Sequence, residues 1–264
     1  MYETRYHRPK TLAEAAGLFS GEARYISGGQ TLIPTMKQRL AAPSDLIEIA
    51  RLPELRGIAA TTGGVAVGAA MTHAEVAASD VVRNAIPALA ELAGTVGDPA
   101  VRAMGTLGGS IANNDPAADY PAALLALGAT VHTDRRVIAA ADFFTGLFST
   151  ALQDGEIVTR VDFPAPAKAA YEKFPNPASR YAMAGVFVAR MKDGGVRVGV
   201  TGAGNTGVFR ATAIEVALAK SWSPSVIDAV TIDTAGMLAD IHGTATYRAN
   251  LVKVMAKRAV AAVG

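Results

Sequence analysis

The sequence predicts an α+β fold in which two α/β units precede a C-terminal antiparallel sheet with helices. Near the N-terminus, a short strand runs directly into adjacent glycines and then into a helix. Later, a predicted hairpin is followed by helices, and two alternating segments flank Asp193-Gly194-Gly195, which is typical of an antiparallel pair. A chain of 264 residues, 50% of them hydrophobic, can bury a large core over two or three units. We expect these units at residues 1–56, 57–168 and 169–264.

The first unit alternates helix and strand. Thr11, with Glu14 three residues later, matches a capping box, so a helix is expected to begin there. A strand is expected over residues 24–26, a helix with a tolerated early proline over 31–40, and a second strand over 46–49. The order of strand, glycine turn and helix is what an anion site at a helix N-terminus requires.

The second unit begins with a hairpin and continues into helices. Residues 58–60 and 65–67 flank a Thr-Thr-Gly-Gly turn, which predicts a hairpin. Helices are expected over residues 72–77 and 86–93. Residues 94–119 are rich in glycine and polar side chains and show little helical periodicity. They therefore predict a long loop, and such loops in compact domains are usually functional.

The pattern beyond this loop completes the second unit and defines the third. A helix is expected over residues 121–127 and a strand over 130–133, before a proline-rich linker at 164–167. The alternating segments of the third unit cover residues 184–191 and 196–200. Two further helices are expected in this unit, over residues 211–220 and 247–262.

Two glycine turns carry the strongest functional signal in the chain. The first is Ser27-Gly28-Gly29-Gln30-Thr31-Leu32, and the second is Thr106-Leu107-Gly108-Gly109-Ser110. Adjacent glycines let successive backbone N–H groups converge on one point, because no Cβ blocks the approach. One such concavity suits a phosphate, and two suit the two phosphates of a dinucleotide. Either turn by itself is also typical of a tight bend at the end of a strand.

Composition narrows the classes of function. The formal net charge is +2, so no basic stripe for nucleic acid is expected. Because the chain has no cysteine, it offers no thiol nucleophile and no thiolate-held iron–sulfur cluster. Its four histidines lie far apart in sequence, so no metal site is expected. The polar start is unlike a secretory signal and the apolar run at residues 122–131 is too short to span a bilayer, so we expect a cytoplasmic protein without a membrane span.

A more familiar motif, Gly202-Ala203-Gly204-Asn205-Thr206-Gly207, fits the G-x-G-x-x-G pattern. A dinucleotide site of that type needs a βαβ unit with an acidic residue at the end of the next strand. Here the next helix is followed by Ser221-Trp222-Ser223-Pro224, which is no strand. A turn between a strand and a helix is therefore expected, and an NAD(P)-dependent oxidoreductase built on this motif is kept as the alternative.

The residues flanking the two glycine turns match a known pattern. Ile33-Pro34 follows the first turn, and the second lies within Val101-Arg102-Ala103-Met104-Gly105 through Asn113-Asn114-Asp115-Pro116-Ala117-Ala118-Asp119. Further matches are Lys173-Phe174, Ser179-Arg180-Tyr181-Ala182, Asp240-Ile241-His242 and Tyr247-Arg248. Together these motifs resemble the FAD-binding medium subunits of molybdenum hydroxylases, a group that includes carbon monoxide dehydrogenase and the flavin domain of xanthine dehydrogenase. Ser27 stands where alanine is usual, and Ala103 where asparagine is frequent.

The resemblance implies a fold and a function. It implies a PCMH-type FAD-binding fold, in which the first two units enclose non-covalent FAD and the third lies near the flavin ring. Molybdopterin would be held by a large subunit and [2Fe-2S] clusters by a small iron–sulfur subunit, in a dimer of heterotrimers. This chain would pass electrons from the clusters through FAD to an external acceptor. A binding module that has lost FAD is the other alternative.

The resemblance also assigns roles to single residues. Both glycine turns would hold the pyrophosphate. Asp119 would accept hydrogen bonds from ribose or ribityl hydroxyls, or would cap the helix that follows. Lys173 would lie near the flavin, unless it is an exposed strand lysine, and Tyr181 would flank the ring, unless it packs in the core. No catalytic or metal-binding residue is expected, and the predicted cofactor site comprises Ser27, Gly28, Gly29, Gln30, Thr31, Leu32, Thr106, Leu107, Gly108, Gly109, Ser110, Asp119, Lys173 and Tyr181.

Overall fold

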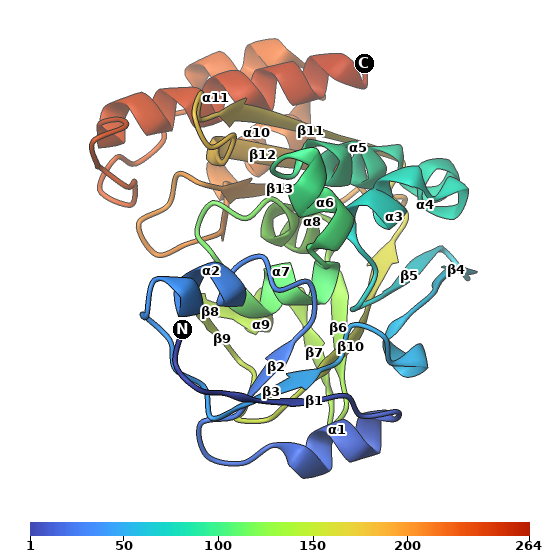
Figure 1. The fold of residues 1–264 in the computed structure, drawn as a ribbon. Coiled ribbons are helices and arrows are strands. Elements are labelled where there is room, and N and C mark those ends of the chain that lie inside the picture. The colour runs from blue at the N-terminus through green and yellow to red at the C-terminus, as the bar shows by residue number, and fades with distance from the viewer.

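The N-terminal part of the molecule is a small parallel sheet with two helices, at the bottom of Figure 1. The computed structural model describes all residues, 1–264. The strands lie in the order β1-β3-β2, and both outer strands run parallel to the central one. Thr11 accepts a hydrogen bond from the backbone of Glu14 and so begins the first helix, as predicted. The elements are β1 (Arg5–His7), α1 (Leu12–Leu18), β2 (Arg24–Ile26), α2 (Leu32–Lys37), β3 (Asp45–Glu48) and η1 (Pro53–Leu55).

The helix after the first glycine turn is shorter than predicted. It ends at Lys37, three residues before the expected Leu40, and Arg39 has a φ of 61°. A non-glycine residue in this left-handed region cannot continue a right-handed helix. The expected order of strand, glycine turn and helix is nevertheless present, since β2 ends at Ile26 and α2 begins at Leu32.

The middle of the molecule contains a five-stranded antiparallel sheet in the order β4-β5-β10-β6-β7. Its central strand β10 places Val161 between Val67 and Val131, and all three side chains are buried. The predicted hairpin is present, since Thr61 pairs with Gly64 across a two-residue turn. The strands are β4 (Ile58–Thr61), β5 (Gly64–Gly68), β6 (Thr130–Thr133), β7 (Val137–Ala139) and β10 (Val158–Pro164). The helices before β6 are α3 (His73–Ala78), α4 (Asp80–Ala85), α5 (Pro87–Thr95), α6 (Pro99–Met104), α7 (Leu107–Asn113) and α8 (Tyr120–Leu127).

The prediction of one long loop over residues 94–119 is wrong. This stretch contains α6, capped by the Asp98 side chain, and α7, capped by the Thr106 side chain. The helices span six and seven residues, which is too short to show helical periodicity. Paired glycines in α7 hid it further, because glycine is a poor helix former. The helix α4, also missed, has six residues as well.

The C-terminal part is a four-stranded antiparallel sheet covered by helices. Helix α11 packs against one face of the sheet at the top of Figure 1, and α8 of the middle part packs against β12 and β13. Contact with α8 is close, since a Cβ at Gly199 would lie 2.1 Å from the carbonyl oxygen of Ala122. The elements are α9 (Ala140–Phe143), β8 (Phe144–Gly146) and β9 (Ser149–Thr150) before the sheet, then β11 (Lys168–Pro175), β12 (Ala182–Arg190), β13 (Val196–Thr201), β14 (Phe209–Arg210), α10 (Thr212–Lys220), η2 (Pro224–Ala229) and α11 (Ala245–Ala262).

The segment Gly202–Gly207 is a turn between two antiparallel strands. The preceding strand β13 pairs antiparallel with both β12 and β14. No βαβ unit begins there, because the turn leads into β14 instead of a helix. The backbone oxygen of Gly202 accepts a hydrogen bond from Arg248, which ties the turn to α11.

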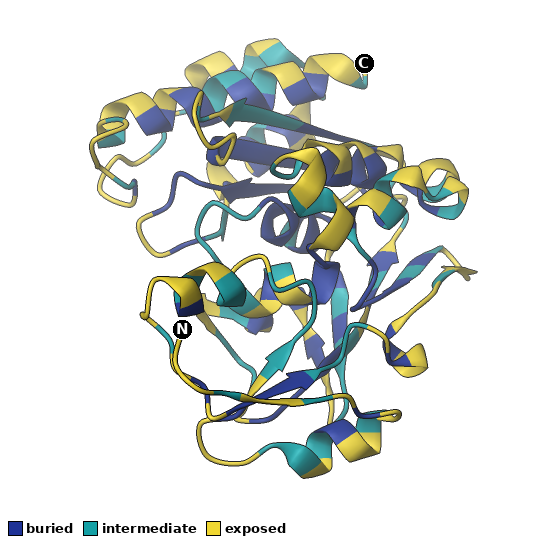
Figure 2. Ribbon diagram, viewed as in Figure 1, coloured by how far each residue is buried: buried dark blue, intermediate teal, exposed yellow.

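The hydrophobic core joins the middle and C-terminal parts. Its largest cluster combines Val67, Leu124 and Val161 with Tyr171 and Phe187 from β11 and β12. A second cluster lies between the C-terminal sheet and α11, and a small third one lies under the N-terminal sheet. Figure 2 shows the buried strands and α8 inside a shell of exposed helix faces. The N-terminal part therefore contributes least to the common core.

Candidate functional site

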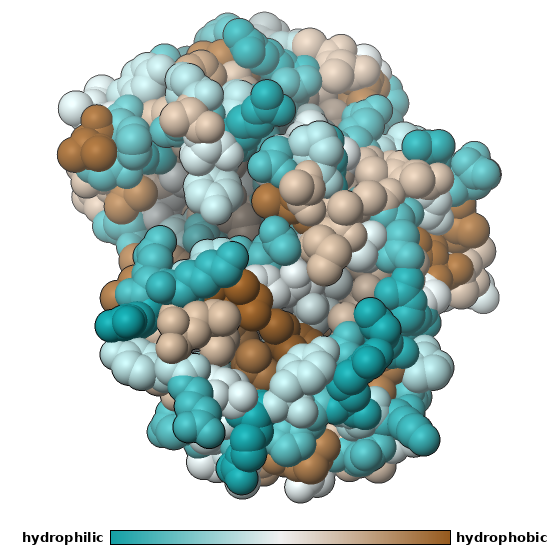
Figure 3. Space-filling view, viewed as in Figure 1, coloured by the Kyte–Doolittle hydropathy of each residue, from teal (hydrophilic) through white to brown (hydrophobic).

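A cavity of about 940 Å³ opens between the N-terminal part and the remainder of the molecule. Residues from 19–55, 69–158 and 178–181 line it, so all three parts of the chain contribute. Figure 3 shows a hollow in the middle of this face with hydrophobic side chains inside and hydrophilic ones at its border. This volume is at the upper end of the range of about 300–1,000 Å³ that is typical of small-molecule and cofactor sites. The cavity is therefore large enough for a dinucleotide-sized ligand.

Both predicted glycine turns lie in the wall of this cavity and touch one another. The Thr106 hydroxyl donates a hydrogen bond of 3.1 Å to the hydroxyl of Ser27. Gly28 lies directly against the backbone before the second turn, since a Cβ at this position would be 2.1 Å from the carbonyl oxygen of Met104. The absence of a side chain at Gly28 thus permits the close approach of two segments far apart in sequence.

The first turn presents a run of free backbone donors. The amides from Ser27 to Leu32 donate no hydrogen bond within the protein, and the next amide, that of Ile33, bonds the carbonyl of Gly29. Gly29 itself has a φ of 68°, a left-handed conformation that redirects the chain toward α2. Six successive N–H groups at a cavity wall form the kind of concavity that binds an anion. The prediction of available amides thus holds for this turn.

The second turn differs from the prediction, because its amides are already used. The amides of Leu107 and Gly108 donate to the carbonyls of Met71 and Ala69, at 3.0 and 2.8 Å. Those of Gly109 and Ser110 both donate to Thr106, to its hydroxyl at 3.2 Å and its carbonyl at 2.9 Å. The expectation of converging free amides is therefore wrong here, since these residues form the first turn of a capped helix.

Packing explains the glycines of the second turn. A Cβ at Gly108 would lie 2.6 Å from the Cβ of Ala69, so a side chain there would push α7 away from the segment that follows β5. Leu107 is fully buried in the core and does not line the cavity. What this turn offers a ligand is its hydroxyls, since Thr106 and Ser110 line the cavity and the Ser110 hydroxyl has no partner in the protein.

Asp119 is the buried carboxylate of the site. It lines the cavity and is only 6% exposed. Its Oδ1 accepts hydrogen bonds from the Tyr171 hydroxyl at 2.5 Å and from the Lys173 ammonium at 3.0 Å. Burial raises the pKa of Asp119, while the neighbouring charge of Lys173 opposes that shift. Although Asp119 precedes α8, its side chain accepts no backbone hydrogen bond there, so the helix-cap interpretation is wrong.

Lys173 is not an exposed strand lysine, and Tyr181 does not pack in the core. The Lys173 side chain is only 7% exposed and also donates to the carbonyl of Thr95 at 2.8 Å, so it is not an exposed strand lysine. It lies behind Asp119 and does not line the cavity. Tyr181 is 59% exposed and does line the cavity, so it is not a core residue.

Several cavity residues escaped prediction from the sequence. His73 is 4% exposed, its Nδ1 has no hydrogen-bond partner, and burial lowers its pKa to about 4. Phe19 and Tyr25 stack with ring centroids 5.0 Å apart. A lone histidine or a pair of aromatic residues gives no sequence signal that separates a site from a core. The cavity residues missed in this way include Phe19, Tyr25, His73, Asp98, Leu152 and Glu156.

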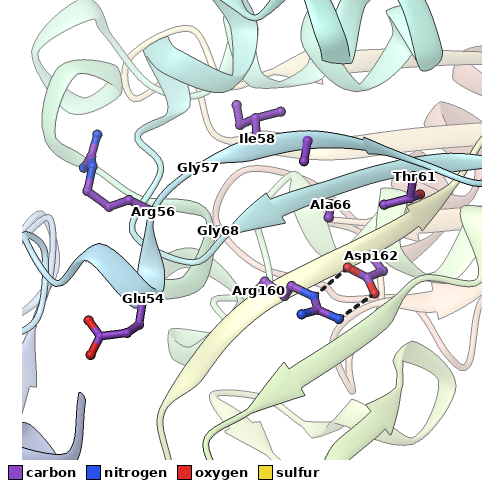
Figure 4. A pocket seen from close by; sticks show the side chains of 10 residues that line it. Glu54, Arg56, Gly57, Ile58, Thr61, Ala66, Gly68, Arg160 and Asp162 are labelled. Carbon is purple, nitrogen blue, oxygen red and sulfur yellow. Dashed lines mark hydrogen bonds and ion pairs between the residues drawn. The ribbon is translucent and has the colours of Figure 1, made fainter. Parts of the chain in front are cut away.

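A shallower groove of about 420 Å³ lies elsewhere, on the outer face of strands β4, β5 and β10. Figure 4 shows Arg160 and Asp162 facing each other there, and the two side chains form an ion pair at 3.0 Å. Arg56 pairs with Glu75, and Glu54 accepts a hydrogen bond from the amide of Leu12. Because these charges are paired within the protein and no predicted site residue lies here, the larger cavity is the candidate site.

No group of three or more histidine, cysteine, aspartate or glutamate side chains is placed to hold a metal ion. None of the helices combines the length and the apolar character needed to cross a bilayer.

Comparison with known proteins agrees with the geometry. Residues 2–166 match the family model described as the FAD binding domain in molybdopterin dehydrogenase. The chain is 35% identical to the carbon monoxide dehydrogenase medium chain of Afipia carboxidovorans, covering 97% of this chain and 94% of that one. It is 33% identical to the nicotine 6-hydroxylase medium subunit of Paenarthrobacter nicotinovorans, covering 98% and 97%. The solved structure of reconstituted carbon monoxide dehydrogenase from Oligotropha carboxidovorans superposes with a TM-score of 0.90 at 34% identity, covering 98% of this chain and 97% of that one.

Proposed function

The chain belongs to the family of FAD-binding subunits of molybdopterin dehydrogenases, and on this premise we propose that it is the electron-transfer subunit of such a complex. In this proposal, FAD receives electrons from iron–sulfur clusters on a partner chain and delivers them to an external acceptor. Flavin chemistry suits this task because a flavin exchanges electrons singly or in pairs. The observation that carries the proposal is the run of free amides from Ser27 to Leu32 in the wall of a dinucleotide-sized cavity.

The residues of the first turn fit a diphosphate. Six amides without protein partners are strong donors, and hydrogen bonds to a charged group contribute roughly 1.5–3 kcal/mol each. We propose that these amides, with the hydroxyls of Thr106 and Ser110, hold the FAD pyrophosphate without a covalent bond. Gly108 and Gly109 serve this arrangement indirectly. Gly108 lets α7 pack close to Ala69, and Gly109 leaves room for the Thr106 hydroxyl that caps α7.

Two further side chains fit the remaining parts of the cofactor. Asp119 is an acceptor-only group in the cavity wall, which suits the hydroxyls of a ribityl or ribose chain. Tyr181 exposes an aromatic ring on the cavity, which suits contact with the flat ring system of the flavin. Both assignments are proposals for this chain's own side chains.

The partners follow from what this chain lacks. It has no cysteine, so thiolate-held clusters must reside on another chain, which we propose to be a small iron–sulfur subunit. A large subunit would carry the molybdenum cofactor and oxidise the substrate. We further propose a dimer of heterotrimers located in the cytoplasm. The relatives are named for substrates as different as carbon monoxide and nicotine, which supports the proposal that the large subunit determines the substrate.

An absorption spectrum tests the proposal. The full chain is incubated with FAD, passed over a desalting column, and its visible spectrum is recorded before and after acid denaturation. We expect flavin bands on the native protein and intact FAD in the supernatant after acid. A colourless chain would favour a module that has lost FAD, and binding of NAD without flavin would favour the alternative built on Gly202–Gly207. Colour that stays with the denatured protein would contradict non-covalent binding.

The partner proposal has its own test. Affinity purification of the tagged chain from its native host is expected to yield two further polypeptides, with molybdenum and iron in the eluate by elemental analysis. Purification of the chain without any metal-containing partner would contradict the electron-transfer assignment, while leaving FAD binding intact.

A further inference from the structure

We propose that Tyr171 and Lys173 are positioning residues that act on the cofactor only through Asp119, by occupying its Oδ1 and leaving Oδ2 as the acceptor for a ligand hydroxyl. This inference rests on the proposed function, because the hydroxyl belongs to the FAD ribityl or ribose chain. It replaces a direct role for Lys173 beside the flavin, since Lys173 does not line the cavity and Asp119 does.

The geometry of β11 places both groups behind the carboxylate. Tyr171 and Lys173 are two positions apart on this strand, so their side chains leave the same face of the sheet. Both reach Oδ1 of Asp119, at 2.5 Å and 3.0 Å. No other residue donates a hydrogen bond to Oδ2. A ligand in the cavity therefore meets a carboxylate that is held from behind and has one free oxygen.

The neighbouring strand leaves room for this arrangement. Gly185 on β12 pairs with Lys173 on β11, and a Cβ at Gly185 would lie 2.3 Å from the Tyr171 hydroxyl. Any side chain at Gly185 would thus displace the hydroxyl from Asp119. The glycine is needed for the hydrogen bond to form, even though it lies outside the cavity.

Charge balance explains the role of Lys173, and the orientation of the carboxylate explains that of Tyr171. Asp119 is 6% exposed, and an unpaired carboxylate at this depth would take up a proton. A protonated Asp119 would present a donor as well as an acceptor to the ligand hydroxyls. The ammonium of Lys173 compensates the charge, and its second bond to the carbonyl of Thr95 holds it in place. The hydroxyl of Tyr171 then fixes which oxygen faces the cavity.

The test compares FAD affinity across pH in the full chain. Tyr171→Phe and Lys173→Met are measured by flavin fluorescence titration, with Lys168→Met, an exposed lysine on the same strand, as the control. We expect the affinity of wild type and of the control to change less between about pH 6 and 8 than that of Lys173→Met, because the charge of Lys173 opposes the rise in the pKa of Asp119 that burial causes. In Lys173→Met, affinity at pH 6 should be about fivefold or more below that at pH 8, because Asp119 has lost its compensating charge and takes up a proton. Tyr171→Phe keeps that charge, so it should weaken FAD binding by a similar factor at every pH, because the orientation of the carboxylate is lost. Lys173→Arg should restore the wild-type profile, because it keeps the charge.

A double-mutant cycle and a spectroscopic readout separate the possible outcomes. In an Asp119→Asn background, Tyr171→Phe should have no further effect on affinity, because its route to the cofactor is gone. Additive losses, or a Lys173→Met loss that is equal at every pH, would overturn the proposal. Infrared difference spectra of the apoprotein should show a protonated carboxyl in Lys173→Met that is absent in wild type. This readout needs no FAD, so it still decides the roles of the two residues if the wild-type chain binds none. Should Lys173→Met fail to fold, the isosteric Tyr171→Phe still decides the positioning role through the double-mutant cycle with Asp119→Asn.

Discussion

The hydroxyl of Thr106 lies 3.1 Å from that of Ser27 and joins two turns separated by 79 residues. The same hydroxyl accepts the amide of Gly109 and so begins helix α7. One side chain thus connects the N-terminal part to the middle part and positions the helix beside the cavity. Four predictions follow from this junction and from the groups around it, in addition to the pH test of Tyr171 and Lys173.

Replacing Thr106 should affect stability more than replacing its partner. Thr106→Val removes both a helix cap and the bond to Ser27, so we expect the free energy of unfolding to fall by about 1–2 kcal/mol. Ser27→Ala removes only the bond between the turns and should cost about 0.5–1 kcal/mol. Urea denaturation of both variants measures the difference. Equal losses would show that the cap of α7 contributes nothing.

Adding one methyl group at Gly28 should be strongly unfavourable. A Cβ there would lie 2.1 Å from the carbonyl oxygen of Met104, so the two turns would have to separate. We expect Gly28→Ala to lower the free energy of unfolding by about 1–3 kcal/mol and to weaken FAD binding with it. Gly17→Ala in α1 is the matched control, because a Cβ there meets nothing within 4 Å, and it should stabilise the protein by about 0.5–1 kcal/mol. A Gly28→Ala chain as stable as wild type would contradict the close contact.

A negative charge at the first turn should oppose the diphosphate. Gln30 is exposed beside the free amides, so Gln30→Glu should leave the fold intact and weaken FAD binding about tenfold by charge repulsion. Gln38→Glu makes the same change in net charge at the other end of α2 and should have little effect. Titration of the apoprotein with FAD at low and high salt measures both variants. Equal effects of the two substitutions would place the diphosphate elsewhere.

Glu156 should make stability depend on acid pH. Hydrogen bonds from Arg136, at 2.9 Å, lower the pKa of the Glu156 carboxyl from 4.5 to about 2. Because the folded state holds this carboxyl ionised, the stabilisation is fully present above about pH 4.5 and is lost as the pH falls toward 2. Glu156→Gln should lower the free energy of unfolding at pH 7 by about 2 kcal/mol and flatten its decline with acid.

The control for this acid effect is an exposed carboxyl. Glu22, whose side chain is 79% exposed, lies 3.7 Å from Arg24, so Glu22→Gln should change neither the stability at pH 7 nor its pH profile. Urea titrations from pH 2 to 7 compare the three proteins, and a Glu156→Gln profile parallel to wild type would contradict the assignment.

Local patterns in the sequence predicted many of the elements. The cap at Thr11, the hairpin around Gly63 and the alternating strands around Gly194 depend on neighbouring residues, and each is present. Helices α4, α6 and α7 were missed, since pieces of six or seven residues show no clear period and are stabilised by packing. The motifs of the two glycine turns identified the family. A joint pattern over many residues is specific for one family, whereas a single glycine turn occurs in many folds.

The sequence by itself identified the family through its joint motifs. It also predicted the first turn as a donor of free amides, since such a turn depends on the backbone conformation of adjacent residues. Only the tertiary structure decided what each glycine and each charge does. Gly28 and Gly108 must be glycine because other segments pack directly against them. Lys173 faces Asp119 because β11 and the start of α8 meet there. Contacts between residues distant in the chain depend on how the sheets and helices pack, and no local pattern records that packing.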